Sequence, residues 1–330
     1  MNKSLRGLCA LLLLCTTAFA SAEDKTFLIK FSHVVADDTP KGQGALMFKK
    51  LVEERLAGQV AVEIYPNSTL HGDADEMQAL LDGKVQMLAP SLAKFSQYAP
   101  QLQVFDLPFL FDDLDAVNRF QKGAKGRQLL SSMEKQDIAG LAYWHNGMKQ
   151  LTAKRTLQQP ADAKGLSFRI QASSVIESQF TQLGATPVKL PFAATTEALR
   201  SGTVQGTENT WSNIQSQGYA QYLTHATQSD HGVLDYMLVT NSRFWYSMPH
   251  SVRMELEAII DEVTYAVNKA ADRQNQNDRA QLQAAGMQIT ELDAAARNAW
   301  RDAMRPVWQQ NEQLIGADVI RAAERANRRH

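Results

Sequence analysis

The stretch Gln78-Ala-Leu-Leu-Asp-Gly-Lys-Val-Gln86 decides the fold, because Glu197-Ala-Leu-Arg-Ser-Gly-Thr-Val-Gln205 repeats it in the second half of the chain. Five of the nine positions are identical in the two copies. Each copy has the pattern of a helix end, a glycine at the stop and a short apolar strand. Nine residues can match by chance, but together with the chain length the repeat favours two α/β lobes, with one copy in each.

The chain around the first copy alternates between strand and helix patterns. Apolar residues alternate with polar ones in its short segments, which is typical of strands. Thr39 predicts a helix N-cap, because Pro40 follows it and proline is favoured at the first helical position. The expected elements are strands at 27–31, 60–64 and 85–89, and helices from Pro40 to Gly58 and over 73–81. This alternation favours the α/β class, in which helices cover the faces of a sheet.

The second copy lies in a similar setting. Strands are expected at 138–144, 166–170 and 233–240, and a helix at 175–183. From Pro249 a helical pattern continues to about Ala285 without another proline or a glycine, which is long enough to touch two lobes. Two lobes also suit the length, since a chain of this size exceeds one comfortable hydrophobic core.

The first 22 residues predict a secretory signal peptide, 1–22. Two positive residues, an apolar run over 8–19 and the small-x-small cleavage site Ala20-Ser-Ala22 follow one another. The apolar run has about a dozen residues, whereas a membrane-spanning helix needs ~20. We therefore expect a periplasmic mature chain that begins at Glu23, with no direct membrane insertion.

The predicted signal removes several classes of function. Both cysteines, Cys9 and Cys15, lie within it, so the mature chain has no thiol for a disulfide, a metal or a nucleophile. A leucine precedes each cysteine, where a lipoprotein signal has a small residue. Without Lys3 and Arg6, 32 basic side chains remain against 35 acidic ones, and this balance gives no positive field to hold nucleic acid.

Motifs for catalysis and cofactor binding are missing from the sequence. It has no G-x-S-x-G elbow, no H-E-x-x-H and no Walker loop. Gly42-Gln-Gly44 resembles the start of a dinucleotide fingerprint, but Met47 replaces the third glycine. The seven histidines are scattered, without the spacing of a metal site. We expect no cofactor, no metal and no enzymatic activity.

An arginine inside an apolar strand is the first candidate for ligand binding. Arg169 lies in the segment Leu166-Ser-Phe-Arg-Ile-Gln171. From the residues alone, it is equally well an exposed residue of an edge strand. A buried arginine would instead demand an anion, and its planar fork suits a carboxylate held by two parallel bonds.

Six short segments follow one another in a recognisable order. They are Phe31-Ser-His-Val34, Tyr65-Pro-Asn-Ser-Thr-Leu70, Phe105-Asp-Leu-Pro-Phe-Leu-Phe111, Gly165-Leu-Ser-Phe-Arg-Ile170, Pro191-Phe192 and Gly202-Thr-Val-Gln-Gly-Thr-Glu-Asn209. Any one of them is a weak signal. Their order and spacing together resemble the DctP-type solute-binding proteins of tripartite ATP-independent periplasmic (TRAP) transporters, over essentially the whole mature chain.

The resemblance implies a two-lobed, periplasmic-binding-protein-like α/β fold, with a ligand cleft between the lobes and a long helix bridging both. Lobe I is then expected over 23–146 plus about 235–274, and lobe II over 147–234 plus about 275–330. The implied role is capture of a solute without turnover. The implied partners are the integral membrane subunits of the transporter.

The resemblance also implies the site. Arg169 would pair with a carboxylate of the ligand, and Asn209 would hydrogen-bond the same group. Phe192 would form a wall of the pocket, and the loop over 90–95 would reach the ligand from the first lobe. Lys149 stands where an arginine is common in the family, and a lysine lacks the planar fork.

Charge selects the expected ligand class. Lys41, Lys94, Lys149 and Arg169 are more cations than one monocarboxylate needs, and the segments 39–42 and 207–213 resemble the branch of the family that binds C4-dicarboxylates. We therefore expect succinate, fumarate or malate as the ligand. The expected ligand-binding residues are Arg169, Asn209, Lys149, Lys94, Lys41, Ser91, His33, Phe192, Gln171, Trp211 and Asn213.

Other interpretations stay open at this point. Lys41 and Lys94 are also compatible with solvated surface lysines. The ligand could be a monocarboxylate such as a keto, sugar or aromatic acid. A periplasmic lyase would need a general base with a tuned partner, and none can be named in the sequence. A protein that presents its ligand to a sensor would have the same sequence features as one that serves transport.

Overall fold

The computed structural model describes residues 26–328. The predicted signal peptide at 1–22, with Cys9 and Cys15, lies outside the described residues. In the described part of the chain, no helix combines the length and the apolar character needed to cross a bilayer.

The strands form one mixed sheet in the order β2-β1-β3-β8-β4-β7-β5-β6, and β9 pairs with β8 beside this path. The strands are β1 Phe27–Ser32, β2 Val60–Tyr65, β3 Met87–Leu88, β4 Ile138–Ala153, β5 Ser167–Ile170, β6 Thr186–Lys189, β7 Gly206–Asn209, β8 His225–Asn241 and β9 Gln288–Glu291. Read from its two edges inward, the sheet has the same connectivity, because β2-β1-β3 corresponds to β6-β5-β7.

This symmetry confirms the duplication predicted from the repeated stretch. The first unit, 27–88, runs β1, α1 (Pro40–Arg55), β2, α2 (Glu76–Leu81), β3, and the second unit, 167–209, runs β5, α5 (Ser174–Gln182), β6, α6 (Thr195–Ser201), β7. In each unit the first strand pairs in parallel with the other two. The repeated stretches fall on α2–β3 and α6–β7. Gly83 and Gly202 end these helices at φ 72° and 77°, a conformation that glycine adopts without strain.

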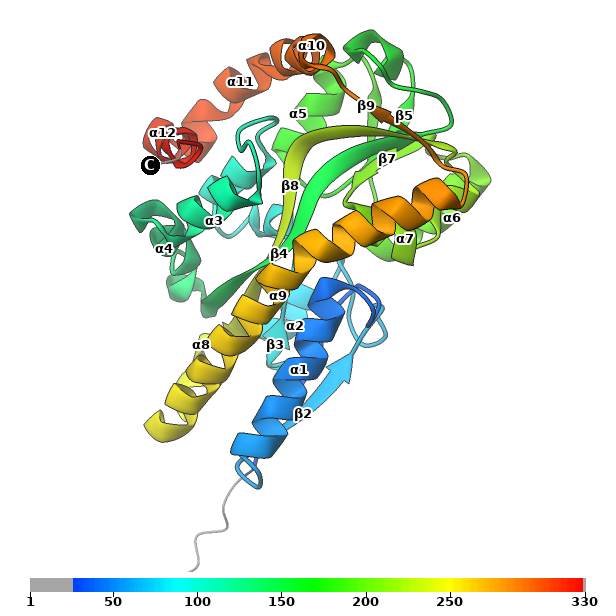
Figure 1. The fold of residues 1–330 in the computed structure, drawn as a ribbon. Helices are drawn as coiled ribbons and strands as arrows, with labels where there is room; N and C mark the ends of the chain where they lie inside the picture. The colour runs from blue at the N-terminus through cyan, green and yellow to red at the C-terminus, as the bar shows by residue number, and fades with distance from the viewer. Residues whose placement is uncertain (1–25, 329–330) are drawn as a thin grey trace, which may run out of the picture.

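Two long strands and one long helix join the units. β4 and β8 pair antiparallel along most of their length, and in Figure 1 they run from the first unit to the second. Helix α9 (His250–Ala284) packs on α1 near one end and on α7 (Trp211–Ser216) near the other, with β4 between. The predicted long helix from Pro249 to Ala285 is confirmed.

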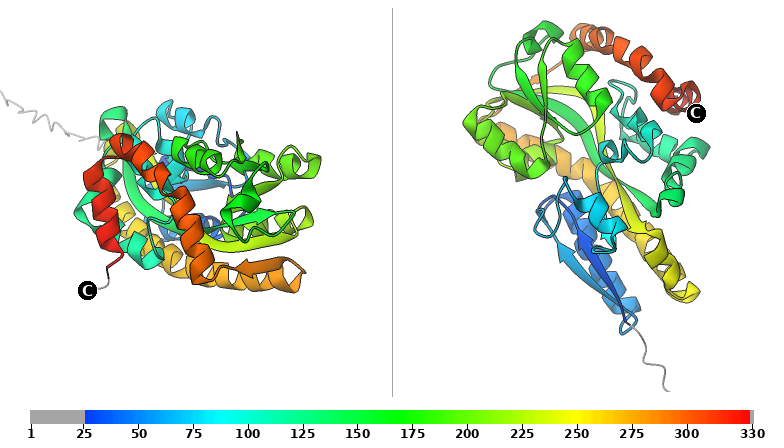
Figure 2. Two further views of the ribbon diagram at one scale, coloured as in Figure 1. Left: turned by 90° about the horizontal axis from the view of Figure 1, so that it is seen from above. Right: turned by 180° about the vertical axis from the view of Figure 1, so that it is seen from behind.

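The remaining helices cover the ends and one side of the sheet. Figures 1 and 2 show α10–α12 passing over the end of the molecule that holds the second unit, with α3 and α4 beside the long strands. One apolar cluster combines residues of 77–143 with residues of 307–323, which the expected boundaries assign to different lobes. Because this cluster spans both expected lobes, it does not separate them, and the expected lobe boundaries stay a prediction. The bounds are α3 Leu114–Lys122, α4 Ala124–Leu130, α8 Ser242–Ser247, α10 Ala294–Met304, α11 Pro306–Ile315 and α12 Ala317–Ala326.

Candidate functional site

A small cavity, with a volume of about 20 Å³, lies where the two units meet. A larger groove of about 620 Å³ lies between α3 and α9, and its lining holds none of the residues predicted for ligand binding. The small cavity gathers six of them together with Asp73, Tyr236 and three aliphatic side chains. The six are Ser91, Arg169, Gln171, Phe192, Asn209 and Asn213.

Arg169 lies on β5 and is buried, with 2% of its surface exposed. Its Nε and Nη2 donate to the carbonyl oxygen of Leu190 at 3.0 and 2.8 Å, and its guanidinium carbon lies 5.9 Å from the ring centre of Phe192. A guanidinium has five N–H donors, so these two bonds leave three of them. The arginine is thus the buried form that demands an anion, and an edge position in solvent is excluded.

Asp73 forms an ion pair with this arginine. Its Oδ2 accepts a hydrogen bond from the backbone N–H of Phe192 at 2.6 Å and lies 3.2 Å from Lys94 Nζ and 4.0 Å from Arg169 Nη2. Sequence reasoning missed Asp73, because an acidic residue just before a helix is typical of any helix start. Its place at the cavity depends on contacts with the second unit, such as the bond from Phe192, which the sequence does not reveal.

Two predicted residues lie just behind the lining. Lys41 is 1% exposed; its Nζ donates to the carbonyl oxygen of Ala89 at 2.9 Å and lies 3.7 Å from the ring centre of Tyr236, which lines the cavity. Burial lowers the pKa of Lys41 to about 8, although Glu76 and Asp73 oppose the shift. Burial and then the charge of Lys41 lower the pKa of His33 to about 3, so this imidazole is neutral at physiological pH.

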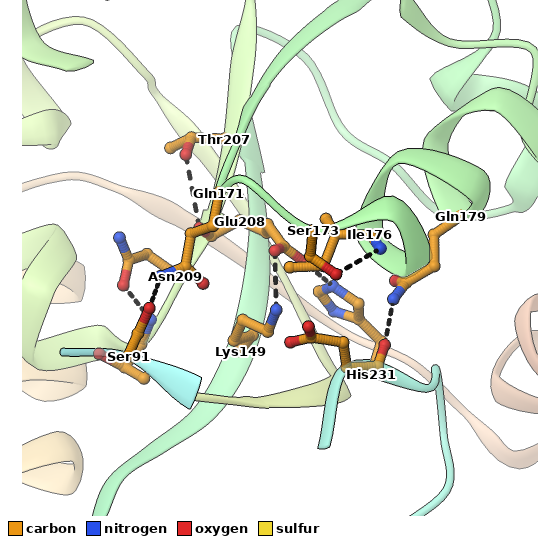
Figure 3. A network of polar contacts seen from close by, with 12 residues as sticks. Ser91, Lys149, Gln171, Ser173, Ile176, Gln179, Thr207, Glu208, Asn209 and His231 are labelled. Carbon is orange, nitrogen blue, oxygen red and sulfur yellow. Dashed lines mark hydrogen bonds and ion pairs between the residues drawn. The ribbon is translucent and has the colours of Figure 1, made fainter. Parts of the chain in front are cut away.

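Amide side chains complete the cavity. Asn209 Oδ1 accepts from Asn213 Nδ2 at 2.9 Å, whereas Asn209 Nδ2 is buried and has no hydrogen-bond partner within residues 26–328. Gln171 Nε2 donates to Ser91 Oγ at 2.7 Å, which joins a residue that follows β5 to one that follows β3 (Figure 3). A buried, unpaired amide N–H carries a large desolvation cost unless a further acceptor reaches it.

Lys149 belongs to a separate buried network. Its Nζ lies 2.7 Å from Glu208 Oε1, with both side chains 1% exposed, and Glu208 Oε2 lies 2.8 Å from His231 Nε2 (Figure 3). Burial opposes ionisation of Glu208, but Lys149 and His231 outweigh it and lower its pKa to about 2. The structure therefore places Lys149 in an ion pair outside the lining of the cavity.

Trp211 also lies outside the cavity lining. It is 4% exposed and packs in an apolar cluster with Leu199, Ile214 and Leu282, so it is a core residue.

Within residues 26–328, no group of three or more His, Cys, Asp or Glu side chains is arranged to hold a metal ion. The cavity lining combines the guanidinium of Arg169 with amide side chains and the carboxylate of Asp73, and its unused N–H donors suit an anionic organic ligand.

Comparisons with known proteins agree with this chemistry. Residues 31–314 match the DctP family, bacterial extracellular solute-binding protein, family 7. The C4-dicarboxylate-binding periplasmic protein DctP of Shewanella loihica is 50% identical over 300 residues, 91% of this chain and 89% of that protein. Among solved structures, a TRAP periplasmic solute-binding protein of Shewanella oneidensis with bound succinate matches with a TM-score of 0.91 and 50% identity, covering 92% of this chain and 100% of that one. A corresponding protein of Pseudomonas aeruginosa with bound L-malate has a TM-score of 0.85 and 60% identity, covering 86% and 99%.

Proposed function

Because the chain belongs to the DctP family of bacterial extracellular solute-binding proteins, we propose that it captures C4-dicarboxylates for uptake by a TRAP transporter. The relative of Shewanella loihica is named for this ligand class, and the matched structures of Shewanella oneidensis and Pseudomonas aeruginosa hold succinate and L-malate. The observation that carries the proposal is the buried guanidinium of Arg169 at a cavity beside which Lys41 and Lys94 provide further positive charge.

Each unit has groups for one carboxylate of the ligand. On the side of the second unit, the free N–H groups of Arg169 and the unpaired Nδ2 of Asn209 would bind one carboxylate. Lys41 of the first unit, and Lys94 in the segment that follows this unit, would supply positive charge for the other. A ligand that contacts both units favours their closed arrangement by its differential affinity for it.

The remaining predicted residues act around these contacts. Phe192 forms an apolar wall beside the guanidinium, and the bond between Gln171 and Ser91 connects the two units next to the ligand. His33 is buried beside Lys41 and is neutral, so it adds no charge to the site. Lys149 and Trp211 have structural roles in this proposal.

The transport role implies a location and a partner. The predicted signal peptide would deliver the mature chain to the periplasm, as the name of the relative from Shewanella loihica describes for that protein. The closed, liganded form would dock on the membrane subunits of the transporter, with no catalytic turnover. Both statements rest on the family and on the predicted signal peptide at 1–22.

The proposal is tested by titration calorimetry of the purified mature chain. Succinate, fumarate and L-malate are titrated beside butyrate, which has the same carbon chain as succinate and one carboxylate fewer. We expect saturable 1:1 binding of at least one C4-dicarboxylate and much weaker binding of butyrate. Binding of monocarboxylates alone would refute the proposed ligand class.

A further inference from the structure

The charges around the cavity do not consist of cations alone. Lys41, Lys94 and Arg169 contribute three positive charges, and Asp73 and Glu76 provide two carboxyl groups beside them. Asp73 lines the cavity itself, with 6% of its side chain exposed. A site that only maximised its attraction for anions would have no carboxylate at this position.

The geometry makes Asp73 a partner of the cations that the ligand uses. Its Oδ2 lies 3.2 Å from Lys94 Nζ and 4.0 Å from Arg169 Nη2. Screening by water is weak at this burial, so one negative charge here reduces the attraction that the site exerts on every charge of the ligand. The backbone N–H of Phe192 holds the carboxylate in place at 2.6 Å.

Glu76 does not duplicate this effect. It is 2% exposed, and its Oε1 has no hydrogen-bond partner within the described residues. Burial and then the charge of Asp73 raise its pKa to about 7, so near neutral pH Glu76 carries less than a full negative charge. Asp73, which lines the cavity and pairs with Lys94, is therefore the carboxylate that opposes the cations there.

We propose that Asp73 is a specificity-determining residue. Its carboxylate neutralises one of the three cations and thereby determines which ligand charge the site prefers. With one cation neutralised, the remaining positive charge matches a dianion. The inference rests on the proposed function, since it concerns the same ligand and the same cavity.

The test compares succinate with succinamate, which has the same chain and one carboxylate replaced by a neutral amide. Asp73→Asn keeps an oxygen that can accept from the N–H of Phe192, but it removes the negative charge. Any effect of the variant on closure or shape acts on both ligands and cancels in the ratio of their Kd values. The extra charge of succinate does not cancel, so the preference for succinate over succinamate rises roughly tenfold or more in Asp73→Asn.

Asp75→Asn is the matched control. Asp75 lies two residues further along, but its side chain is 59% exposed and pairs with His71. Solvent screens this charge from the cavity, so the preference in Asp75→Asn stays within about twofold of wild type. Circular dichroism verifies the fold of each variant, and Asp73→Ser replaces Asp73→Asn if the latter does not fold.

Three outcomes separate the inference from the proposed function. A higher preference for succinate in the Asp73 variant alone supports the inference. If wild type binds succinate but the preference is unchanged in the Asp73 variant, or rises equally in Asp75→Asn, the inference is overturned and the proposed function stands. If wild type binds no C4-dicarboxylate, the proposed function fails, and the inference falls with it.

Discussion

Replacing Arg169 by alanine removes the buried guanidinium to which the proposal assigns a carboxylate of the ligand. The side chain is almost completely buried, and it donates twice to the carbonyl oxygen of Leu190. Three further N–H groups remain for a ligand carboxylate. Arg169→Ala therefore has two separate consequences, one for ligand binding and one for stability.

The two effects have different sizes. Hydrogen bonds between a guanidinium and a carboxylate contribute ~1.5–3 kcal/mol each, so the loss of two weakens binding by ~3–6 kcal/mol, a hundredfold or more. The carbonyl of Leu190 loses its donor, and an unsatisfied buried acceptor costs about 1–3 kcal/mol of folding stability. A domain stabilised by ~5–15 kcal/mol tolerates this loss.

Calorimetry with succinate measures the first effect, and urea unfolding followed by circular dichroism measures the second. Arg169→Lys keeps the charge but loses the fork, and we expect it to bind poorly as well. Arg200→Ala is the control, because Arg200 is 62% exposed and pairs with its neighbour Glu197 on α6. If Arg169→Ala is folded and binds succinate within about threefold of wild type, the arginine is structural and the assignment of the whole site is refuted.

Two further predictions concern the buried network beside the cavity. Lys149→Met removes the lysine partner of Glu208 and leaves only His231 beside this buried carboxylate, so urea unfolding should show a loss of ~3–5 kcal/mol. The folded variant should bind succinate within about threefold of wild type. A hundredfold loss of affinity would instead show that Lys149 contacts the ligand. The pKa of Glu208 is lowered from 4.5 to about 2, so the stability that it contributes is present above pH 4.5 and is lost as the pH falls toward 2, by up to about 3 kcal/mol. Unfolding free energies measured across this pH range should show a smaller loss in Glu208→Gln, and an equal loss in both proteins would contradict the assignment.

Much of the fold could be predicted from the sequence because its signals are local. A helix end, a glycine stop and a strand follow one another in each repeated stretch, and the structure places these on α2–β3 and α6–β7. The N-cap at Thr39 was equally readable, and its side chain accepts a hydrogen bond from the N–H of Gly42. The full lengths of β4 and β8 could not be predicted, because their bulged pairing continues beyond the apolar segments that indicated these strands.

A residue's role in the site could be predicted where it follows from the residue itself and its sequence segment. It could not be predicted where it depends on contacts with residues distant in sequence. The apolar strand around Arg169 left an exposed edge position equally open, and the resemblance to the DctP family favoured the buried anion site. Lys149 in a strand gives no comparable signal, because its role depends on β7 placing Glu208 next to it. Asp73 lies at the cavity beside Phe192 and Arg169, which are distant from it in sequence.

The central claim is that this chain carries a C4-dicarboxylate in the periplasm. The most direct test is to purify the exported protein from the periplasm without added ligand, denature it and identify the released small molecules by mass spectrometry. We predict succinate, fumarate or malate, in an amount comparable to that of the protein. A keto, sugar or aromatic monocarboxylate as the main released species would contradict the claim.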